Sequence, residues 1–205
     1  MPLVVPSEAI ETKEDTLASR RRREWAAFAV VILLAACLRF WRLDQNGLGN
    51  SYYAAAVQSM LINWHNFFFA AFDPGGFVSV DKPPAALWLQ TAFAAVLGYR
   101  GVSLLLPQAL AGVATVAVLT QTVWKASGAT AGLIAGLVLA VSPISVAVDR
   151  DNLPDSLLVF VLVLGAWALL RAVAEGGFGW LFLAVVFVGI GISTTGRTGG
   201  MRKAP

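Results

Sequence analysis

Long apolar runs separated by short polar breaks dominate the pattern of this chain. Helices of about 17 to 25 apolar residues can cross the hydrocarbon core of a bilayer, and five segments approach that length. Their bounds are Glu24–Trp41, Val102–Trp124, Ala129–Val148, Leu153–Ala172 and Phe178–Ile192 or a little beyond, the last of which is marginal. The pattern predicts an all-α, polytopic transmembrane helical protein whose membrane module covers residues 24–192.

The composition agrees with a membrane protein. The chain is 58% hydrophobic and 13% charged, with a mean hydropathy of +0.72, whereas soluble domains carry about 25% charged residues. The net charge of +3 is small, and the basic cluster Arg20–Arg23 precedes an apolar run. This placement favours a topology signal over a nucleic-acid site. We expect a multi-pass protein of the plasma membrane. Its expected partner is the lipid bilayer, and no nucleic acid is expected to bind.

The residues before the first apolar run are expected to form a disordered cytoplasmic tail, residues 1–23. Pro2–Ser19 mix Glu, Asp, Thr and Pro with few large apolar side chains, a composition typical of disorder. No small-residue cleavage signal follows the run Trp25–Trp41. We therefore expect this run to remain as a signal anchor, with the N-terminus in the cytoplasm.

Two segments after the first span are expected to lie at the membrane surface. Asn50–Trp64 has apolar residues at helical spacing with polar residues between them, which predicts a short amphipathic helix. Pro84–Leu97 opens with two prolines and has only about 14 residues, which is short for a span. Residues 43–98 are thus predicted to form an extracytoplasmic loop with interfacial helices.

The distribution of charge supports this arrangement over the alternative in which Pro84–Leu97 crosses the membrane. An interfacial Pro84–Leu97 leaves Lys125 and Arg171 on the cytoplasmic side and Asp149–Asp155 outside. A crossing helix would instead place Lys125 outside and Asp149–Asp155 inside. Only the first arrangement obeys the positive-inside rule, at the cost of one external arginine, Arg100.

Acidic and basic residues converge on the expected outer face. A carboxylate can deprotonate an acceptor hydroxyl or hold a divalent metal, and a cation can neutralise a phosphate leaving group. The group comprises Arg39, Arg42, Asp44, Asp73, Asp81, Lys82, Asp149, Arg150, Asp151 and Asp155. Any one of these residues alone could equally be a solvated loop charge.

Two acidic motifs stand out because each precedes a predicted helix. Asp81 and Lys82 are followed by Pro83 and Pro84, and prolines suit the first turn of a helix. The segment Asp149–Asp155 follows a Ser-Pro break and ends on a Pro-Asp pair at the start of the next apolar run. Helix N-termini favour anions, so both motifs are candidates for phosphate chemistry.

At these residues the sequence resembles the GT-C membrane glycosyltransferases of the protein-mannosyltransferase and aminoarabinose-transferase group, in particular an actinobacterial-type branch. The matching pieces are Tyr52–Met60, Phe67–Pro74, the block Asp81–Pro84 with Trp88, and Ser142-Pro143 followed by Arg150 and Asp155. The Asp-Lys-Pro-Pro block is the most specific of these pieces. The resemblance covers Glu24 to about Gly191 and implies a GT-C-like N-terminal module.

The resemblance implies transfer of a sugar from a polyprenyl-phosphate donor to an extracytoplasmic acceptor, and it leaves the acceptor and the sugar open. It assigns Lys82, with Arg150, to the donor phosphate, and Asp81 and Asp155 to the catalytic site. It also leaves open whether a divalent metal is bound at the site. The family usually carries an Asp-Glu pair where this chain has Gly49 and Asn50, so Asp44 or Asp73 would have to supply the base.

The far end also departs from the family pattern, which continues into many more helices. Residues 193–205 are polar and basic, and we expect an aberrant tail on a truncated N-terminal portion. A non-catalytic membrane protein that binds lipid phosphate or a partner protein is the alternative function. A transporter is disfavoured, because no charged residue falls in the middle of a predicted span.

Overall fold

The structure is a computed structural model that describes residues 7–82 and 84–192. The expected basic tail, residues 193–205, lies outside the described residues, as do residues 1–6. Within the described part every named element is helical. In chain order the elements are α1 (Ser7–Phe40), the 3-10 helix η1 (Leu43–Asn46), α2 (Ser51–Met60), α3 (Trp64–Phe69), α4 (Ala85–Leu97), α5 (Gly101–Ser127), α6 (Ala129–Val141), α7 (Pro143–Asp149), α8 (Asp155–Glu175) and α9 (Phe178–Ile192).

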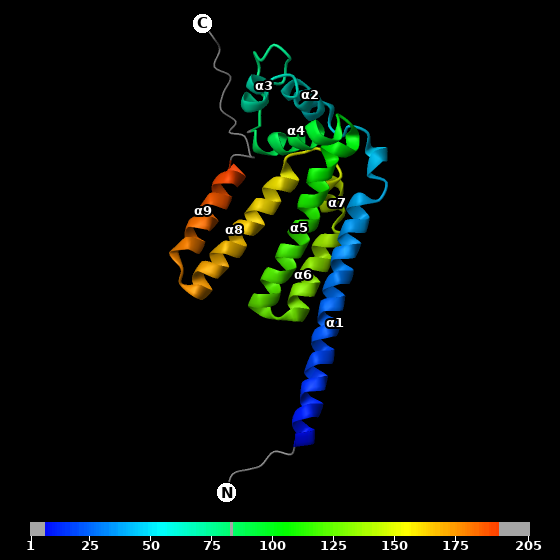
Figure 1. Ribbon diagram of the computed structural model, residues 1–205, viewed down its shortest axis with the longest axis vertical. Coiled ribbons are helices and arrows are strands. Elements are labelled where there is room, and N and C mark those ends of the chain that lie inside the picture. Colours follow the sequence, from blue (N-terminus) through cyan, green and yellow to red (C-terminus); the bar gives the residue numbers. More distant parts are fainter. Residues whose placement is uncertain (1–6, 83, 193–205) are drawn as a thin grey trace.

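The long helices form a bundle that is capped at one end by the short ones (Figure 1). Helix α5 packs against α1, α6 and α8, and α9 packs on α8. The described part of residues 43–97, which we call the cap region, holds η1 and α2 to α4 across the end of the bundle. Helix α4 runs across that end instead of along the bundle, so it is confirmed as a separate short helix of 13 residues.

The core of the cap region joins it to the bundle. Apolar side chains of α2 meet those of α4 and of the first turn of α5, and removing such surface from water is the main stabilising term of packing. This cluster includes Tyr53, Ala54, Val57, Met60, Leu87, Ala94 and Leu104. The cap region is therefore packed against the bundle through a buried apolar contact.

Among the residues that the structure describes, two helices are long and apolar enough to cross a membrane, or three if a bent pair counts as one span. Helices α5 and α8 satisfy length and hydropathy individually, and α6 with α7 satisfies them together. Helix α9 starts at Phe178, as predicted, and runs for 15 residues up to Ile192, the last residue that the structure describes. The chain is thus an all-α polytopic membrane protein.

Two predicted helices are each divided in the structure. The span predicted over Ala129–Val148 bends by 61° between α6 and α7, because Pro143 has no N–H to continue the helix and instead opens a new one. The amphipathic helix predicted over Asn50–Trp64 ends at Met60. Helix α3 then starts beyond Asn63, whose side chain accepts a hydrogen bond from the Asn66 amide at 2.8 Å.

The prediction of a disordered tail is wrong for residues 7–23, which continue α1 as a helix. The sequence from Ser7 to Arg23 lacks Pro and Gly and is rich in Glu, Lys, Arg, Leu and Ala, all residues with high helix propensity. Arg20 also pairs with Glu24 one turn later, at 3.1 Å. Composition indicated polarity correctly, but a polar segment can extend a helix that its apolar neighbour has already nucleated.

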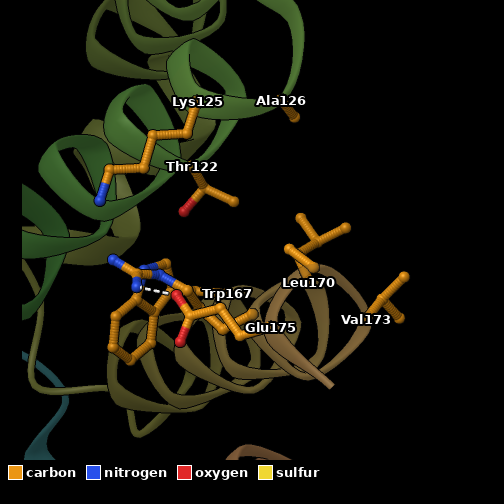
Figure 2. Close-up of a pocket in the computed structure, with 9 residues that line it drawn as sticks. Thr122, Lys125, Ala126, Trp167, Leu170, Val173 and Glu175 are labelled. Atoms are coloured by element: carbon orange, nitrogen blue, oxygen red, sulfur yellow. Dashed lines mark hydrogen bonds and ion pairs between the residues drawn. The ribbon is translucent and has the colours of Figure 1, made fainter. Parts of the chain in front are cut away.

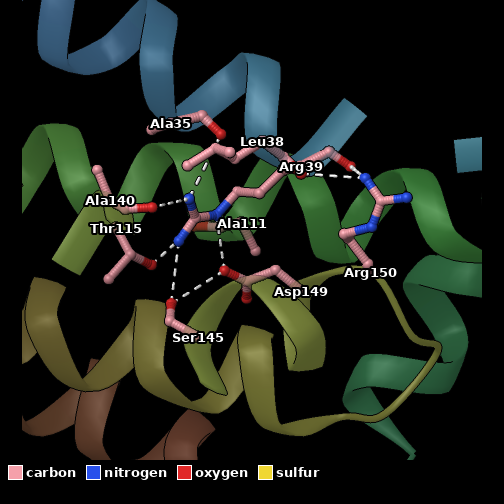
Figure 3. A network of polar contacts seen from close by, with 9 residues as sticks. All are labelled: Ala35, Leu38, Arg39, Ala111, Thr115, Ala140, Ser145, Asp149 and Arg150. Carbon is pink, nitrogen blue, oxygen red and sulfur yellow. Dashed lines mark hydrogen bonds and ion pairs between the residues drawn. The ribbon is translucent and has the colours of Figure 1, made fainter. Parts of the chain in front are cut away.

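A buried ion pair ties the end of α1 to α7 (Figure 3). The sequence left open whether Arg39 and Asp149 are solvated loop charges, and in the structure both are buried: Arg39 is 0% exposed and Asp149 is 4% exposed. The Arg39 Nε donates to Asp149 Oδ2 at 2.7 Å. Its other nitrogens donate to Ser145 Oγ at 2.9 Å and to the carbonyl of Ala140 at 3.2 Å.

The ion pair depends on a glycine in α5. The Asp149 carboxylate lies where a side chain at Gly112 would begin, and the Arg39 guanidinium is close to the same point. Because that space is filled, any larger residue at position 112 would displace the carboxylate or the helix. Close approach of three helices at this point is therefore encoded by Gly112.

Breaking the pair by Asp149→Ala should destabilise the protein by about 3–5 kcal/mol, because Arg39 would remain buried without its counter-charge. Unfolding in mixed detergent micelles measures the difference. The double substitution Arg39→Met with Asp149→Leu should recover most of the lost stability, since the buried charge is then absent. Arg20→Ala, which removes an exposed pair, is the control and should cost about 0.3–0.5 kcal/mol. Equal effects of Asp149→Ala and Arg20→Ala would contradict the structural importance of the buried pair.

Candidate functional site

The cap region is joined to the α7–α8 linker by a polar junction. The Asn50 amide donates to Asp151 Oδ1 at 2.9 Å and to Asn152 Oδ1 at 2.7 Å. The Asn152 amide group returns a bond to the Asn50 carbonyl at 3.1 Å. From α4, Gln90 Nε2 donates to the Asn152 carbonyl at 2.8 Å. The junction confirms that residues 43–82 and the segment Asp149–Asp155 lie at the same end of the bundle.

Gly49 makes this close approach possible. Its backbone φ of +70° lies in the left-handed region, and a Cβ there would meet Asp151 Oδ1 and the Asn152 backbone. An acidic residue at this position would be strained and would face a like charge. The position at which the resemblance expects an acidic pair therefore serves here as a docking point, and the nearest carboxylate comes from Asp151 on the other segment.

Two of the predicted acids, Asp81 and Asp155, face Tyr53 of α2. Burial, together with the smaller effects of the negative charges of Asp81 and Asp155, raises the pKa of Tyr53 to about 12. The neighbouring Tyr52 stacks on Phe72, with ring centroids 4.8 Å apart, and its hydroxyl accepts from the Asp81 amide at 3.3 Å. The structure thus brings the two acidic motifs together around a tyrosine pair.

The role of this tyrosine pair was not predicted from the sequence. In the sequence pattern Tyr53 counts as one apolar residue of an amphipathic helix, although the hydroxyl of a tyrosine is a polar group that usually needs a partner when buried. Two adjacent tyrosines at the start of a surface helix were the available signal. Lys82 follows Asp81 directly and is half-buried, next to the turn that leads into α4.

Asp73 and Asp44 lie apart from these acids. The Asp73 carboxylate accepts from the amides of Val78 at 2.6 Å and Phe77 at 3.2 Å, which closes the loop that carries it. These backbone hydrogen bonds lower the pKa of Asp73, which makes it a weaker base. Asp44 is exposed in η1, and neither residue contributes to the electrostatic environment of Tyr53.

Arg150 caps the C-terminus of α1. Its Nη1 donates to the carbonyls of Leu38 at 3.0 Å and Trp41 at 2.7 Å, and Nη2 donates to Asn46 Oδ1 at 3.4 Å. A cation at the C-terminus of a helix satisfies free carbonyls and interacts favourably with the helix dipole. The guanidinium thereby holds the α7–α8 linker against α1.

A mainly apolar cavity of about 390 Å³ begins beside Asp155. It lies among α5, α6, α7 and α8, in the space created by the bend between α6 and α7. Polar groups at its wall come from Asp149, Asp155 and several hydroxyls, among them those of Ser145 and Ser156. Of the predicted catalytic acids, only Asp155 lines this cavity.

A second cavity, of about 470 Å³, lies at the other end of α5 and α8 (Figure 2). Lys125 and Arg171 line it, and Arg171 is already paired with Glu175 and lies 5.7 Å from the ring centroid of Trp167. It is far from the acidic motifs, because both helices run the length of the bundle between the two ends (Figure 1). Arg171 is neutralised by Glu175 and none of the predicted acids lines this cavity, so it is a weaker candidate for chemistry.

The described residues do not fit a metal held by the protein alone. No three His, Cys, Asp or Glu side chains between residues 7 and 192, Pro83 excepted, gather closely enough to hold an ion. Divalent cations such as Mg²⁺ or Ca²⁺ require several oxygen ligands.

The bundle, its cap of short helices and the acids at their junction define an integral membrane protein with a polar site at one end of the helix bundle. The sequence from residue 81 to residue 201, more than half of the chain, matches the model of the dolichyl-phosphate-mannose-protein mannosyltransferase family. The chain belongs to this family.

Two curated relatives come from Bacillus subtilis strain 168. The protein named "Putative mannosyltransferase YycA" is 48% identical over 171 residues, and "Putative mannosyltransferase YkcB" is 44% identical over 176 residues. The matches cover 83% and 85% of this chain but 25% of each relative, so the chain spans about a quarter of their length. No solved structure matches the chain significantly.

The environment of Tyr53 gives a prediction for alkaline pH. The folded state holds the Tyr53 proton up to about pH 12 instead of 10.0, so its contribution to stability is complete below pH 10 and declines as the pH rises through 12. Asp81→Asn should lower the pKa of Tyr53, measured by phenolate absorbance against a Tyr53→Phe reference. Asp44→Asn is the matched control and should leave it unchanged. Equal shifts of the Tyr53 pKa in both variants would contradict the position of Asp81 near Tyr53.

Proposed function

We propose that this protein transfers a hexose from a polyprenyl-phosphate donor to a hydroxyl acceptor at the capped end of the bundle. The observation that carries the proposal is the convergence of Asp81 and Asp155 on Tyr53, next to Lys82 and beside an apolar cavity. Acids, a cation and an apolar wall are the groups that a lipid-linked phosphosugar and a hydroxyl need. The family membership supports the same reaction class.

In this reaction the acceptor oxygen attacks the anomeric carbon of the sugar while the bond from that carbon to the phosphate oxygen breaks. The phosphate leaves with the bonding electron pair, and Lys82 stabilises its charge. Asp155 takes the proton of the acceptor hydroxyl, because Asp149, the other acid that lines the cavity, is already paired with Arg39. Asp81 lies beside Lys82 and orients it toward the donor phosphate.

The remaining predicted residues have supporting functions in this proposal. Arg150 holds the linker that carries Asp155, through its bonds to the end of α1. Asp73 shapes the loop that precedes Asp81 through its backbone hydrogen bonds. We place the site on the extracytoplasmic side of the plasma membrane, since Lys125, Arg171 and Arg20–Arg23 occupy the other end.

Lys82→Ala should weaken binding of decaprenyl phosphate about tenfold or more, because one charge-assisted hydrogen bond is worth about 1.5–3 kcal/mol. Binding to the protein in detergent micelles and sugar release from radiolabelled donor in membranes are the two measurements. Lys125→Ala removes a cation at the opposite end and is the control. Asp155→Asn should retain binding and lose turnover. Binding without turnover in the unaltered protein would favour the non-catalytic alternative, and full binding by Lys82→Ala would remove Lys82 from the site.

Accessibility to a membrane-impermeant thiol reagent tests the orientation. In a Cys37→Ala background, Ser79→Cys in the cap region should react in intact cells, and Ser127→Cys at the far end of α5 should react only after permeabilisation. Both positions are exposed in the structure, so a lack of labelling reflects the membrane barrier. The reverse pattern would put the acidic site in the cytoplasm and exclude an extracytoplasmic acceptor.

A further inference from the structure

The cavity beside Asp155 contains a buried polar group without a partner. Ser156 lies in the first turn of α8, lines the cavity and is 2% exposed. Its hydroxyl makes no hydrogen bond with any of the residues that the structure describes. Buried hydroxyls are almost always satisfied, so this one marks a position where a ligand or ordered water supplies the partner.

Three other polar side chains of the cavity, those of Asp149, Ser145 and Thr115, already have partners. Asp149 is neutralised by Arg39, and the Ser145 hydroxyl lies between them. The Thr115 hydroxyl donates to the carbonyl of Ala111 at 2.7 Å. Asp155 is therefore the charged residue of this wall that forms no ion pair with the described residues, and its charge is negative. A phosphate would be repelled here, whereas an alcohol can donate to the carboxylate and also bond to Ser156.

The rest of the wall is apolar and opens sideways. It includes Leu139, Ile144, Val148 and Val159. Ile144 is 76% and Val159 is 45% exposed on the flank of the bundle, so hydrocarbon chains can enter from the bilayer. The volume of about 390 Å³ falls within the range of about 300–1,000 Å³ that is typical of small-molecule sites.

We propose that this cavity binds a neutral membrane lipid with a free hydroxyl group as the sugar acceptor. The lipid chains lie along Leu139, Ile144 and Val159, and the hydroxyl lies between Asp155 and Ser156. The inference rests on the proposed function, because the bound alcohol is the nucleophile whose proton Asp155 accepts. The two substrates therefore bind to residues of different charge. Lys82 binds the anionic donor, and Asp155 with Ser156 binds the neutral acceptor.

A pair of lipids that differ only in the hydroxyl group tests the proposal. Native mass spectrometry of the protein in detergent micelles compares 1,2-dioctanoylglycerol with its 3-O-methyl ether, which keeps the chains and lacks the donor. The unaltered protein should bind the alcohol about tenfold more tightly, as expected for loss of one buried hydrogen bond. Ser156→Ala should abolish most of this preference, and Thr122→Ala, at the far cavity, should retain it.

Ser156→Ala should fold normally, because it removes a hydroxyl that has no partner, so a lost preference would not reflect unfolding. Equal binding of the two lipids by the unaltered protein would overturn the proposal. Displacement of dioctanoylglycerol by decaprenyl phosphate in a manner independent of Lys82 would also overturn it, since the cavity would then hold the phosphate lipid.

The same preparations separate this inference from the proposed function. If Lys82→Ala binds decaprenyl phosphate as well as the unaltered protein does, the assignment of the donor site fails, while a Ser156-dependent preference for the alcohol still supports the lipid-alcohol site. If donor binding depends on Lys82 but the preference for the alcohol is absent, the donor site stands and the acceptor is of another class.

Discussion

The buried contact between Arg39 and Asp149 is the interaction on which the arrangement of the bundle and the site depends. Two charges enclosed by apolar helices are tolerated only when they are closely paired and their remaining hydrogen-bonding groups are satisfied. Here Ser145 and the Ala140 carbonyl accept the remaining hydrogen bonds of Arg39. The pair fixes the end of α7 against α1, and Arg150 fixes the following residues to the carbonyls at the end of α1. The linker to α8 therefore starts from a defined position, which sets the position of Asp155.

The candidate site is assembled on this linker from segments that are distant in the chain. The cap region docks on it through Asn50 and Asn152, and the apolar contact of α2 with α4 holds the cap in place. Each contact brings Tyr53 and Asp81 closer to Asp155. In the resulting site, the cation Lys82 follows Asp81 in the cap region, and Asp155 lies at the edge of the mainly apolar cavity.

The bend between α6 and α7 links the membrane module to its cavity. A straight helix would fill the space among α5, α6 and α8, whereas the break at Pro143 turns α7 aside and leaves room beside Asp155. The same break lets Asp149 reach Arg39 across the surface of Gly112. A single helix-breaking residue thus produces both the structural ion pair and the candidate binding cavity of this mannosyltransferase-family chain.

The sequence by itself determined the helical membrane class, the start of α9, the separate short helix α4 and the presence of two acidic motifs at one end, because hydropathy, proline placement and charge bias act locally along the chain. Only the tertiary structure decided which charges are buried. Arg39 and Asp149 looked like loop charges, Gly49 and Asn50 looked like a missing acidic pair, and Ser156 carried no signal. Their environments depend on residues about a hundred positions away, and no local pattern records such contacts.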